Sequence, residues 1–358
     1  MHKKLEEETL GVAESVETQT REDRFGLRIW NIIQSLRLLR ATGMTRELEI
    51  WGFVDGQLVN GVIDELSFTS TDAALEESLS SASTSTSKQR RRKQQQMDDA
   101  DAANQPTISQ FFTSESQVAR QHAETAADVN RKLYLTDVKT RVGTSLPAAS
   151  SLRPTKMQLM LYRRLLADLA SNNVDASQVF SRYGLDANAE LSDLFIQSMS
   201  DIDTNLGPAV ADNPFAEVQT ASGTIAELLS HRTLSLLWQL MVQEYAATLP
   251  SGGSNISRVL RAQFVSQRDQ KIIGDRTFAY DDRLVEEYVA DCLRWWKGER
   301  QARGVVIEEA FKCGICEFAE GCEWRQGKVD EAVIRSREKG SKTTETTAAT
   351  DPPAAAAG

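Results

Sequence analysis

The chain has 358 residues, of which 41% are hydrophobic, and its formal net charge is −10. This size fits one large globular domain or two modest ones. The negative charge disfavours a protein that wraps duplex DNA over a broad basic surface, but it leaves open an enzyme that threads one strand through a narrow positive channel. The sequence has neither an apolar run long enough to cross a bilayer nor a signal peptide at its charged start, so it predicts a soluble protein.

The first segment, 1–69, predicts helix and strand in alternation. After an opening helix, Arg24–Leu39 mixes strand-like and helix-like spacing of its apolar residues. Two strand-like runs follow, Glu47–Val54 and Gln57–Phe68, and the dipeptide Asp55-Gly56 separates them. Because this dipeptide is typical of two-residue turns, we expect the runs to form an antiparallel hairpin.

The composition changes sharply over 70–130, where Ser, Thr, Gln, Ala and Asp dominate. Such a segment has too few apolar side chains to offset the entropy of ordering, so we predict a disordered insertion. The second segment, 131–335, begins with a short strand at Lys132–Leu135. Its helical periodicity lies at Thr155–Ala170, Ile225–Leu249 and Arg283–Lys297. The Thr/Ala/Pro-rich end, 336–358, predicts a disordered tail.

Two acidic residues lie in or at the ends of apolar strands, on either side of the insertion. Asp64 lies in Gly61–Leu66, and Asp137 lies in Tyr134–Arg141. A carboxylate in such a setting needs a cation or hydrogen bonds, and two such strands side by side would let both carboxylates share a divalent metal. The two-residue period of a strand puts Lys139 on the same face as Asp137.

This arrangement suits phosphodiester hydrolysis. Oxygen ligands select Mg²⁺ or Mn²⁺, which polarises a phosphate and lowers the pKa of an attacking water. A neighbouring lysine orients that water and offsets developing negative charge. For either motif alone, a solvated strand edge with an ion pair is the simpler interpretation, and the two motifs together favour the metal site.

Three cysteines, Cys313, Cys316 and Cys322, lie close together near the end of the chain. This clustering indicates metal ligation in a reducing compartment more than a disulfide framework. The spacing by itself leaves zinc and a [4Fe–4S] cluster open.

Asp64 in Gly61–Leu66, the run Asp137–Arg141 and the later pair Gln158 and Tyr162 resemble the motifs of PD-(D/E)XK nucleases of the RecB type. Their order and spacing are most similar to the exonuclease V family, whose members are single-strand-specific exonucleases with an iron–sulfur cluster. The resemblance implies an α/β, restriction-endonuclease-like core with a mixed central sheet flanked by helices. A helical C-terminal part with the iron–sulfur segment would follow it.

The resemblance also implies roles for individual residues. Asp64 and Asp137 would bind the metal, Lys139 would be the catalytic lysine, and the Val138 carbonyl would assist. Gln158 and Tyr162, four residues apart on one helix face, would organise the site. In related nucleases a histidine on an earlier helix is a further metal ligand, and His2 fits that pattern.

For the cysteines, the resemblance favours [4Fe–4S] over zinc, because the family has such a triplet followed by Trp-Arg, as in Trp324-Arg325. The family's fourth cluster ligand lies upstream of the first catalytic helix. Since Cys292 is better explained by packing, we expect this chain to be N-terminally incomplete, with the fourth ligand preceding Met1.

The predicted insertion contains two further motifs. One resembles the peptide by which repair proteins dock on the sliding clamp (PCNA), and it consists of Gln105, Ile108, Phe111 and Phe112. The other is the basic run Lys88–Lys93, which suits nuclear import or phosphate contact and is equally explained as a solvated charge cluster.

The leading hypothesis is therefore a monomeric, Mg²⁺-dependent single-stranded DNA exonuclease of DNA repair, in the nucleus, the mitochondrion or both. A catalytically impaired nuclease-fold scaffold that recruits the sliding clamp to DNA is the alternative. A zinc-binding interaction module is a third interpretation.

Overall fold

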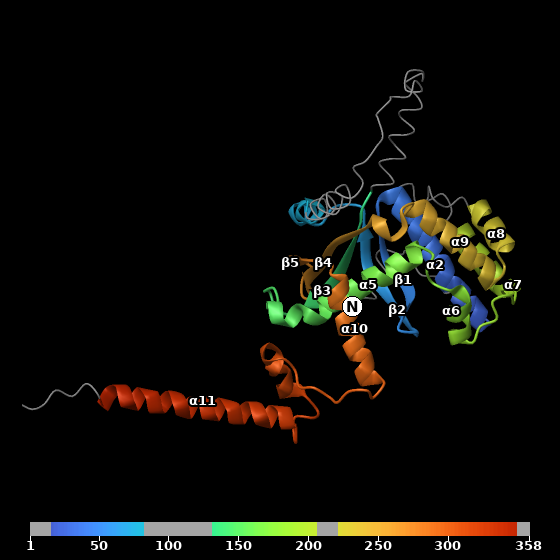
Figure 1. Ribbon diagram of the computed structural model, residues 1–358. Coiled ribbons are helices and arrows are strands. Elements are labelled where there is room, and N and C mark those ends of the chain that lie inside the picture. The colour runs from blue at the N-terminus through green and yellow to red at the C-terminus, as the bar shows by residue number, and fades with distance from the viewer. Residues whose placement is uncertain (1–15, 82–130, 206–220, 349–358) are drawn as a thin grey trace, which may run out of the picture. The chain divides into compact units, whose positions relative to one another are not determined.

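The computed structural model of the protein describes residues 16–81, 131–205 and 221–348 (Figure 1). Its contacts divide the chain into two compact units. The first unit takes in the described residues of Met1–Leu146 and Pro154–Val289, and the second those of Pro147–Arg153 and Ala290–Gly358. None of the described helices is both long and apolar enough to cross a membrane.

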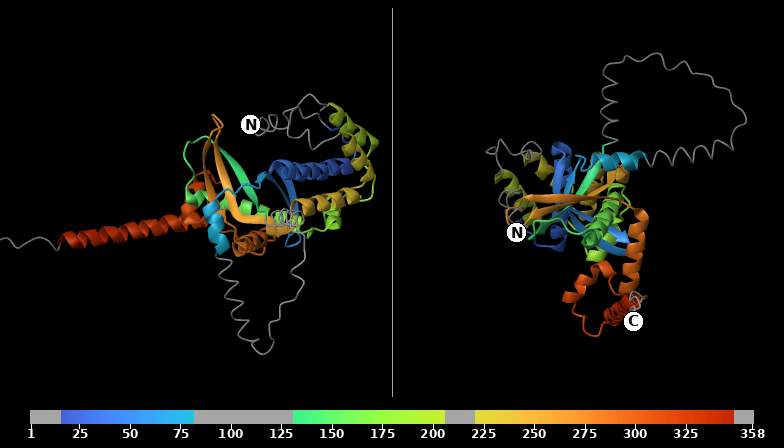
Figure 2. Two further views of the ribbon diagram at one scale, coloured as in Figure 1. Left: turned by 90° about the horizontal axis from the view of Figure 1, so that it is seen from above. Right: turned by 90° about the vertical axis from the view of Figure 1, so that its left-hand side faces the viewer.

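The first unit is built on a five-stranded mixed sheet of order β1-β2-β3-β4-β5. The β3–β4 pair is parallel and the other neighbouring pairs are antiparallel. The predicted mixed sheet flanked by helices is thus confirmed (Figures 1 and 2). The strands are β1 (Met44–Val54), β2 (Gln57–Ser67), β3 (Leu133–Arg141), β4 (Ile256–Ser266) and β5 (Ile272–Ala279).

The predicted hairpin is confirmed as β1 and β2. Val54 pairs with Gln57 across the turn, and the two turn residues both have positive φ, 50° at Asp55 and 73° at Gly56. Positive φ at both central residues matches the right-handed twist of the flanking strands, and Asp-Gly tolerates it. The sequence therefore fixes this register locally.

The β2–β3 pair is short. It extends only over Glu65↔Thr136, Leu66↔Leu135 and Ser67↔Tyr134, whereas β3 stays paired with β4 as far as Arg141↔Ser266. Beyond Glu65 and Thr136, therefore, β2 and β3 separate from each other within the sheet.

Two helices hold the β1 side of the sheet. Helix α2 (Arg21–Thr42) packs on β1 and on α9 (Leu234–Thr248). The rings of Phe25, Trp51 and Trp238 stack in series, with centroids 5.2 and 5.9 Å apart. This aromatic series joins α2, β1 and α9 into one apolar core.

Helix α5 (Arg153–Ala170) packs on the hairpin, where an added Cβ on Gly52 would lie 2.6 Å from Leu165. The helices α6 (Ala176–Tyr183), α7 (Asp193–Asn205) and α8 (Ala221–Ser230) follow it along the chain. Arg37 on α2 joins Glu227 on α8 and Glu244 on α9 at 2.7 Å each, which fixes these helices by charge as well as by packing.

Some expected elements are corrected by the structure. Arg24–Leu39 is entirely helical, and the predicted helix Ile225–Leu249 is split because Thr233 caps α9 through its side chain. The predicted insertion begins with a helix at 73–81, where Asp72 accepts the Leu75 N–H at 3.0 Å. The strands β4 and β5 and the helices α6 and α7 were not anticipated.

The second unit contains η2 (Ala149–Leu152), η4 (Ile307–Ile315) and α11 (Glu323–Ala348), and α10 (Asp282–Trp296) leads into it. Helix α11 continues well past residue 336, where the sequence predicted a disordered tail. Within the part of this helix before residue 336, Glu331 pairs with Lys328 and Arg335, and such pairs support a helix.

Candidate active site

The two predicted carboxylates meet where β2 and β3 separate. The Val138 N–H donates to Asp64 Oδ2 at 2.6 Å, so the side chain from β2 takes the place of a missing strand acceptor. Asp137 is the next residue on β3. The structure therefore brings Asp64 and Asp137 together from positions 73 residues apart, with the insertion between them in the sequence.

Asp137 is a buried carboxylate, and one of its oxygens has no hydrogen-bond partner among the described residues. Its Oδ1 accepts a hydrogen bond from Lys139 Nζ at 2.8 Å, whereas its buried Oδ2 has no partner within the described part of the chain. Burial raises the pKa of Asp137, Lys139 opposes that rise, and the nearby Asp64 charge adds to it. A buried acceptor without a donor is costly, and a cation would satisfy it.

Lys139 lies between the strand and helix α5. Its Nζ contacts Asp137 Oδ1 and also Gln158 Oε1, the latter at 3.3 Å. Its side chain remains 36% exposed, so the ammonium group is held in position yet stays accessible to a solvent molecule or a substrate. The predicted association of Asp137, Lys139 and Gln158 is thus present.

Tyr162 reaches the same hairpin from α5, one turn after Gln158. An added Cβ on Gly61 would lie 2.5 Å from its Cζ and 2.6 Å from its hydroxyl oxygen. Sequence analysis missed Gly61 as a site residue. A glycine inside a strand is itself a signal of close approach by another group, and here that group is the Tyr162 ring.

The donor set suits a hard divalent cation in part. Asp64 and Asp137 offer carboxylate oxygens, which Mg²⁺ prefers. Within the ranges that the structure describes, no three His, Cys, Asp or Glu side chains gather into a metal-binding group. His2, the predicted third ligand, lies outside those ranges.

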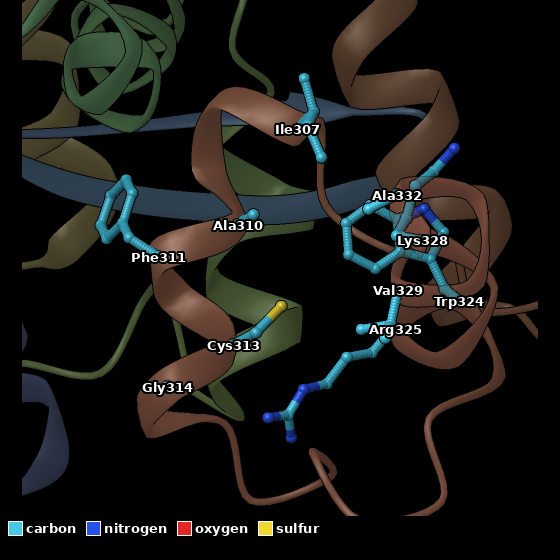
Figure 3. Close-up of a pocket in the computed structure, with 10 residues that line it drawn as sticks. All are labelled: Ile307, Ala310, Phe311, Cys313, Gly314, Trp324, Arg325, Lys328, Val329 and Ala332. Carbon is cyan, nitrogen blue, oxygen red and sulfur yellow. The ribbon is translucent and has the colours of Figure 1, made fainter. Parts of the chain in front are cut away.

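The cysteines belong to the second unit and are free thiols. Cys313 is half-buried at a hollow of about 460 Å³ between η4 and the start of α11, beside Trp324 and Arg325 (Figure 3). Cys316 is exposed and Cys322 half-buried. Within the described residues, these three cysteines do not gather into a metal-binding group as predicted.

The Asp137→Asn variant tests how much folding stability the protein loses when the buried Asp137 carboxyl group ionises. Because the folded pKa lies above the unfolded value, the contribution of Asp137 to stability is full at low pH and is lost as pH rises through the folded pKa. Asparagine keeps an oxygen for Lys139 and cannot ionise. We expect it to stabilise the metal-free protein at neutral pH and to leave its stability nearly unchanged below about pH 4, where the carboxyl is protonated in the unfolded chain too.

Urea unfolding in EDTA from pH 4 to pH 8 measures this difference. Equal stability of the two proteins at every pH would contradict a cost of ionising Asp137 in the fold.

Comparison with known proteins identifies the family to which the chain belongs. Residues 1–325 match the sequence profile of a family described as "Exonuclease V - a 5' deoxyribonuclease". An exonuclease V from Danio rerio is 22% identical over 313 residues, which cover 87% of this chain and 57% of the relative. The chain thus spans a little over half the length of that relative. On the match to most of its length, the chain belongs to the exonuclease V family.

Proposed function

We propose that this chain carries the catalytic core of a metal-dependent nuclease that hydrolyses phosphodiester bonds in DNA, built on a PD-(D/E)XK fold. The observation that carries the proposal is the unpaired buried oxygen of Asp137, next to Asp64 and within reach of Lys139. Family membership supports the same chemistry.

Mg²⁺ or Mn²⁺ is the proposed metal, held by Asp64 and Asp137 with His2 as a further ligand. When bound, it would polarise the scissile phosphate and acidify a water molecule. The free Oδ2 of Asp137 is the position in the described site that most needs a cation, because no protein donor satisfies it.

The protein groups around that position have separate tasks. Asp137 and Gln158 hold the Lys139 ammonium group at two points, which limits its rotation. From there the ammonium group would orient the attacking water and offset negative charge on the phosphate. Tyr162 would contact the substrate from α5.

The proposed substrate is single-stranded DNA degraded from an end, and the proposed setting is DNA repair in the nucleus or mitochondrion. Sliding-clamp binding through Gln105–Phe112 is part of this proposal, although that motif lies outside the described residues. A [4Fe–4S] cluster on Cys313, Cys316 and Cys322 is the proposed structural cofactor.

Lys139→Ala tests the mechanism. Loss of the ammonium group should lower kcat on a labelled single-stranded oligonucleotide by about 10²- to 10⁴-fold, because no other described cation contacts Asp137. Binding of the oligonucleotide should change little. Lys132→Ala, in an exposed lysine at the start of the same strand region, is the matched control and should retain full activity. Hydrolysis that survives Lys139→Ala would refute the mechanism and favour the scaffold.

Gly61→Ala tests the contact with Tyr162. The added methyl group must displace the ring, and we expect about a tenfold lower kcat with little change in KM. In a Tyr162→Ala background the same change should have no further effect.

Gly52→Ala is the control for the helix as a whole, since its methyl group would meet Leu165 on the same helix at 2.6 Å. It should lower the free energy of unfolding by about 1 to 3 kcal/mol and leave kcat per folded molecule unchanged. Equal effects of the two glycine substitutions on kcat would contradict a specific role of Gly61.

The cysteine proposal is tested by spectroscopy. Anaerobically reconstituted protein should show broad visible absorption with bound iron and sulfide, and Cys313→Ser should remove it. Cys292→Ser, in a cysteine outside the triplet, is the control and should keep it. A colourless protein with stoichiometric zinc would contradict the cluster.

A further inference from the structure

A basic hollow lies in the first unit, on residues that the proposed chemistry does not use. Its volume is about 370 Å³, and its lining residues place it between the first turns of α2 and the end of α6. Three guanidinium groups and two aromatic rings line it. The lining residues are Arg21, Arg24, Phe25, Arg28, Tyr183 and Leu185.

Arg28 forms the fixed floor of this basic hollow. Its Nε lies 3.0 Å from Glu49 Oε2, so its charge is already balanced. The guanidinium carbon lies 5.2 Å from the centroid of the Tyr183 ring and 4.9 Å from that of Phe25. The half-buried Tyr183 ring is therefore held in place by Arg28, through a side-chain hydrogen bond and a cation–π contact, and by the Phe25 ring.

Arg21 and Arg24 are different, because both are exposed and neither forms a hydrogen bond or ion pair within the described ranges. The acidic residues beside them are engaged elsewhere. Glu22 accepts the Asp186 N–H at 3.1 Å, and Asp23 accepts bonds from Thr20 and Ser192. The hollow therefore carries two positive charges that form no ion pair within the described ranges, on a chain whose net charge is −10.

These two charges work against the local structure. They lie in the first turns of α2, where the helix dipole disfavours cations, and they are three residues apart on one face, where like charges repel. Such a local conflict within a fold is characteristic of a binding site.

We propose that the basic hollow binds one nucleotide of the single-stranded DNA substrate, at a point separate from the carboxylate site. Arg21 and Arg24 would hold a phosphate, and the base would stack on Tyr183. The pairing of cations with an aromatic platform is how proteins hold single strands without reading sequence. An acidic peptide would use the arginines and gain nothing from the ring. The inference rests on the proposed nuclease function for its choice of ligand.

The hollow is also connected to the catalytic strand. Glu49, which holds Arg28, pairs across the hairpin with Val62, two residues before Asp64. Two residues of strand span about 7 Å. A nucleotide in the hollow would thus be held by the same rigid hairpin that carries a metal-binding carboxylate.

Fluorescence anisotropy of a labelled oligo-dT, in EDTA to prevent hydrolysis, tests the proposal on the full chain. The double variant Arg21→Glu with Arg24→Glu should bind about tenfold more weakly. It should also lower the slope of log affinity against log salt by about 0.7, as expected for the loss of one neutralised phosphate. The matched control, Arg268→Glu with Arg276→Glu, changes the charge equally at two exposed arginines and should bind as the native chain does.

The Tyr183→Ala variant tests whether the hollow recognises a nucleotide base or only the negative charge of a polyanion. The native chain should prefer oligo-dT over an abasic strand of equal length by about tenfold, and the variant should lose that preference. A polyaspartate competitor should displace the oligonucleotide only at much higher concentration. Unchanged DNA affinity in both variants would overturn the proposal, and so would tight polyaspartate binding that ignores Tyr183.

A small substrate distinguishes failure of the nucleotide-binding proposal from failure of the nuclease proposal. Bis(p-nitrophenyl) phosphate with Mn²⁺ is too short to span both sites, so its hydrolysis should require Lys139 and not Arg21 or Arg24. No hydrolysis by the native chain would count against the carboxylate site, whatever the anisotropy shows.

Discussion

The separation of β2 from β3 is the constraint on which the candidate site depends. The strands pair only from Glu65↔Thr136 to Ser67↔Tyr134, and past that point the Val138 N–H has no acceptor on the β2 backbone. Asp64 supplies one with its side chain, since a buried N–H must be satisfied. The same opening buries Asp137 with an oxygen that no described donor reaches. A regular ladder through these positions would leave no space for a cation between the two strands.

The packing of α5 completes this geometry. Gly52 and Gly61 leave room on the hairpin for Leu165 and Tyr162, so the helix approaches the sheet closely along two turns. Gln158, one turn earlier, is then near enough to bind Lys139. The contact of Leu165 with Gly52 stabilises the fold, and the contact of Tyr162 with Gly61 arranges the site. Both contacts depend on a glycine within a strand. Glycine weakens a strand by itself, so its presence at two such positions indicates that close packing offsets the loss.

Sequence patterns predicted what short-range physics determines. The Asp55-Gly56 turn, the strand positions of Asp64 and Asp137, and the helix bearing Gln158 and Tyr162 each follow from local periodicity or turn geometry. The strands β4 and β5 were missed for a different reason. Strand β4 is buried on both faces at most positions and yet contains Arg258 and Arg261, so it shows neither clean alternation nor an apolar run. Likewise, no local signal shows that Gly61 faces Tyr162, because that contact joins residues 101 positions apart.

The fold also determines which charged side chains are paired and which are exposed to a ligand. The carboxylates of Glu49 and Glu244 are paired with arginines, so they contribute little to the field that a ligand meets. Arg21 and Arg24 have no such partners in the described structure, and they dominate their surroundings despite the overall charge of −10. Salt screens the interaction between exposed charges that lie more than about 10 Å apart. A strand of DNA therefore responds to the nearest unpaired groups and not to the net charge of the chain. An acidic chain can therefore bind a polyanion wherever its carboxylates are already paired.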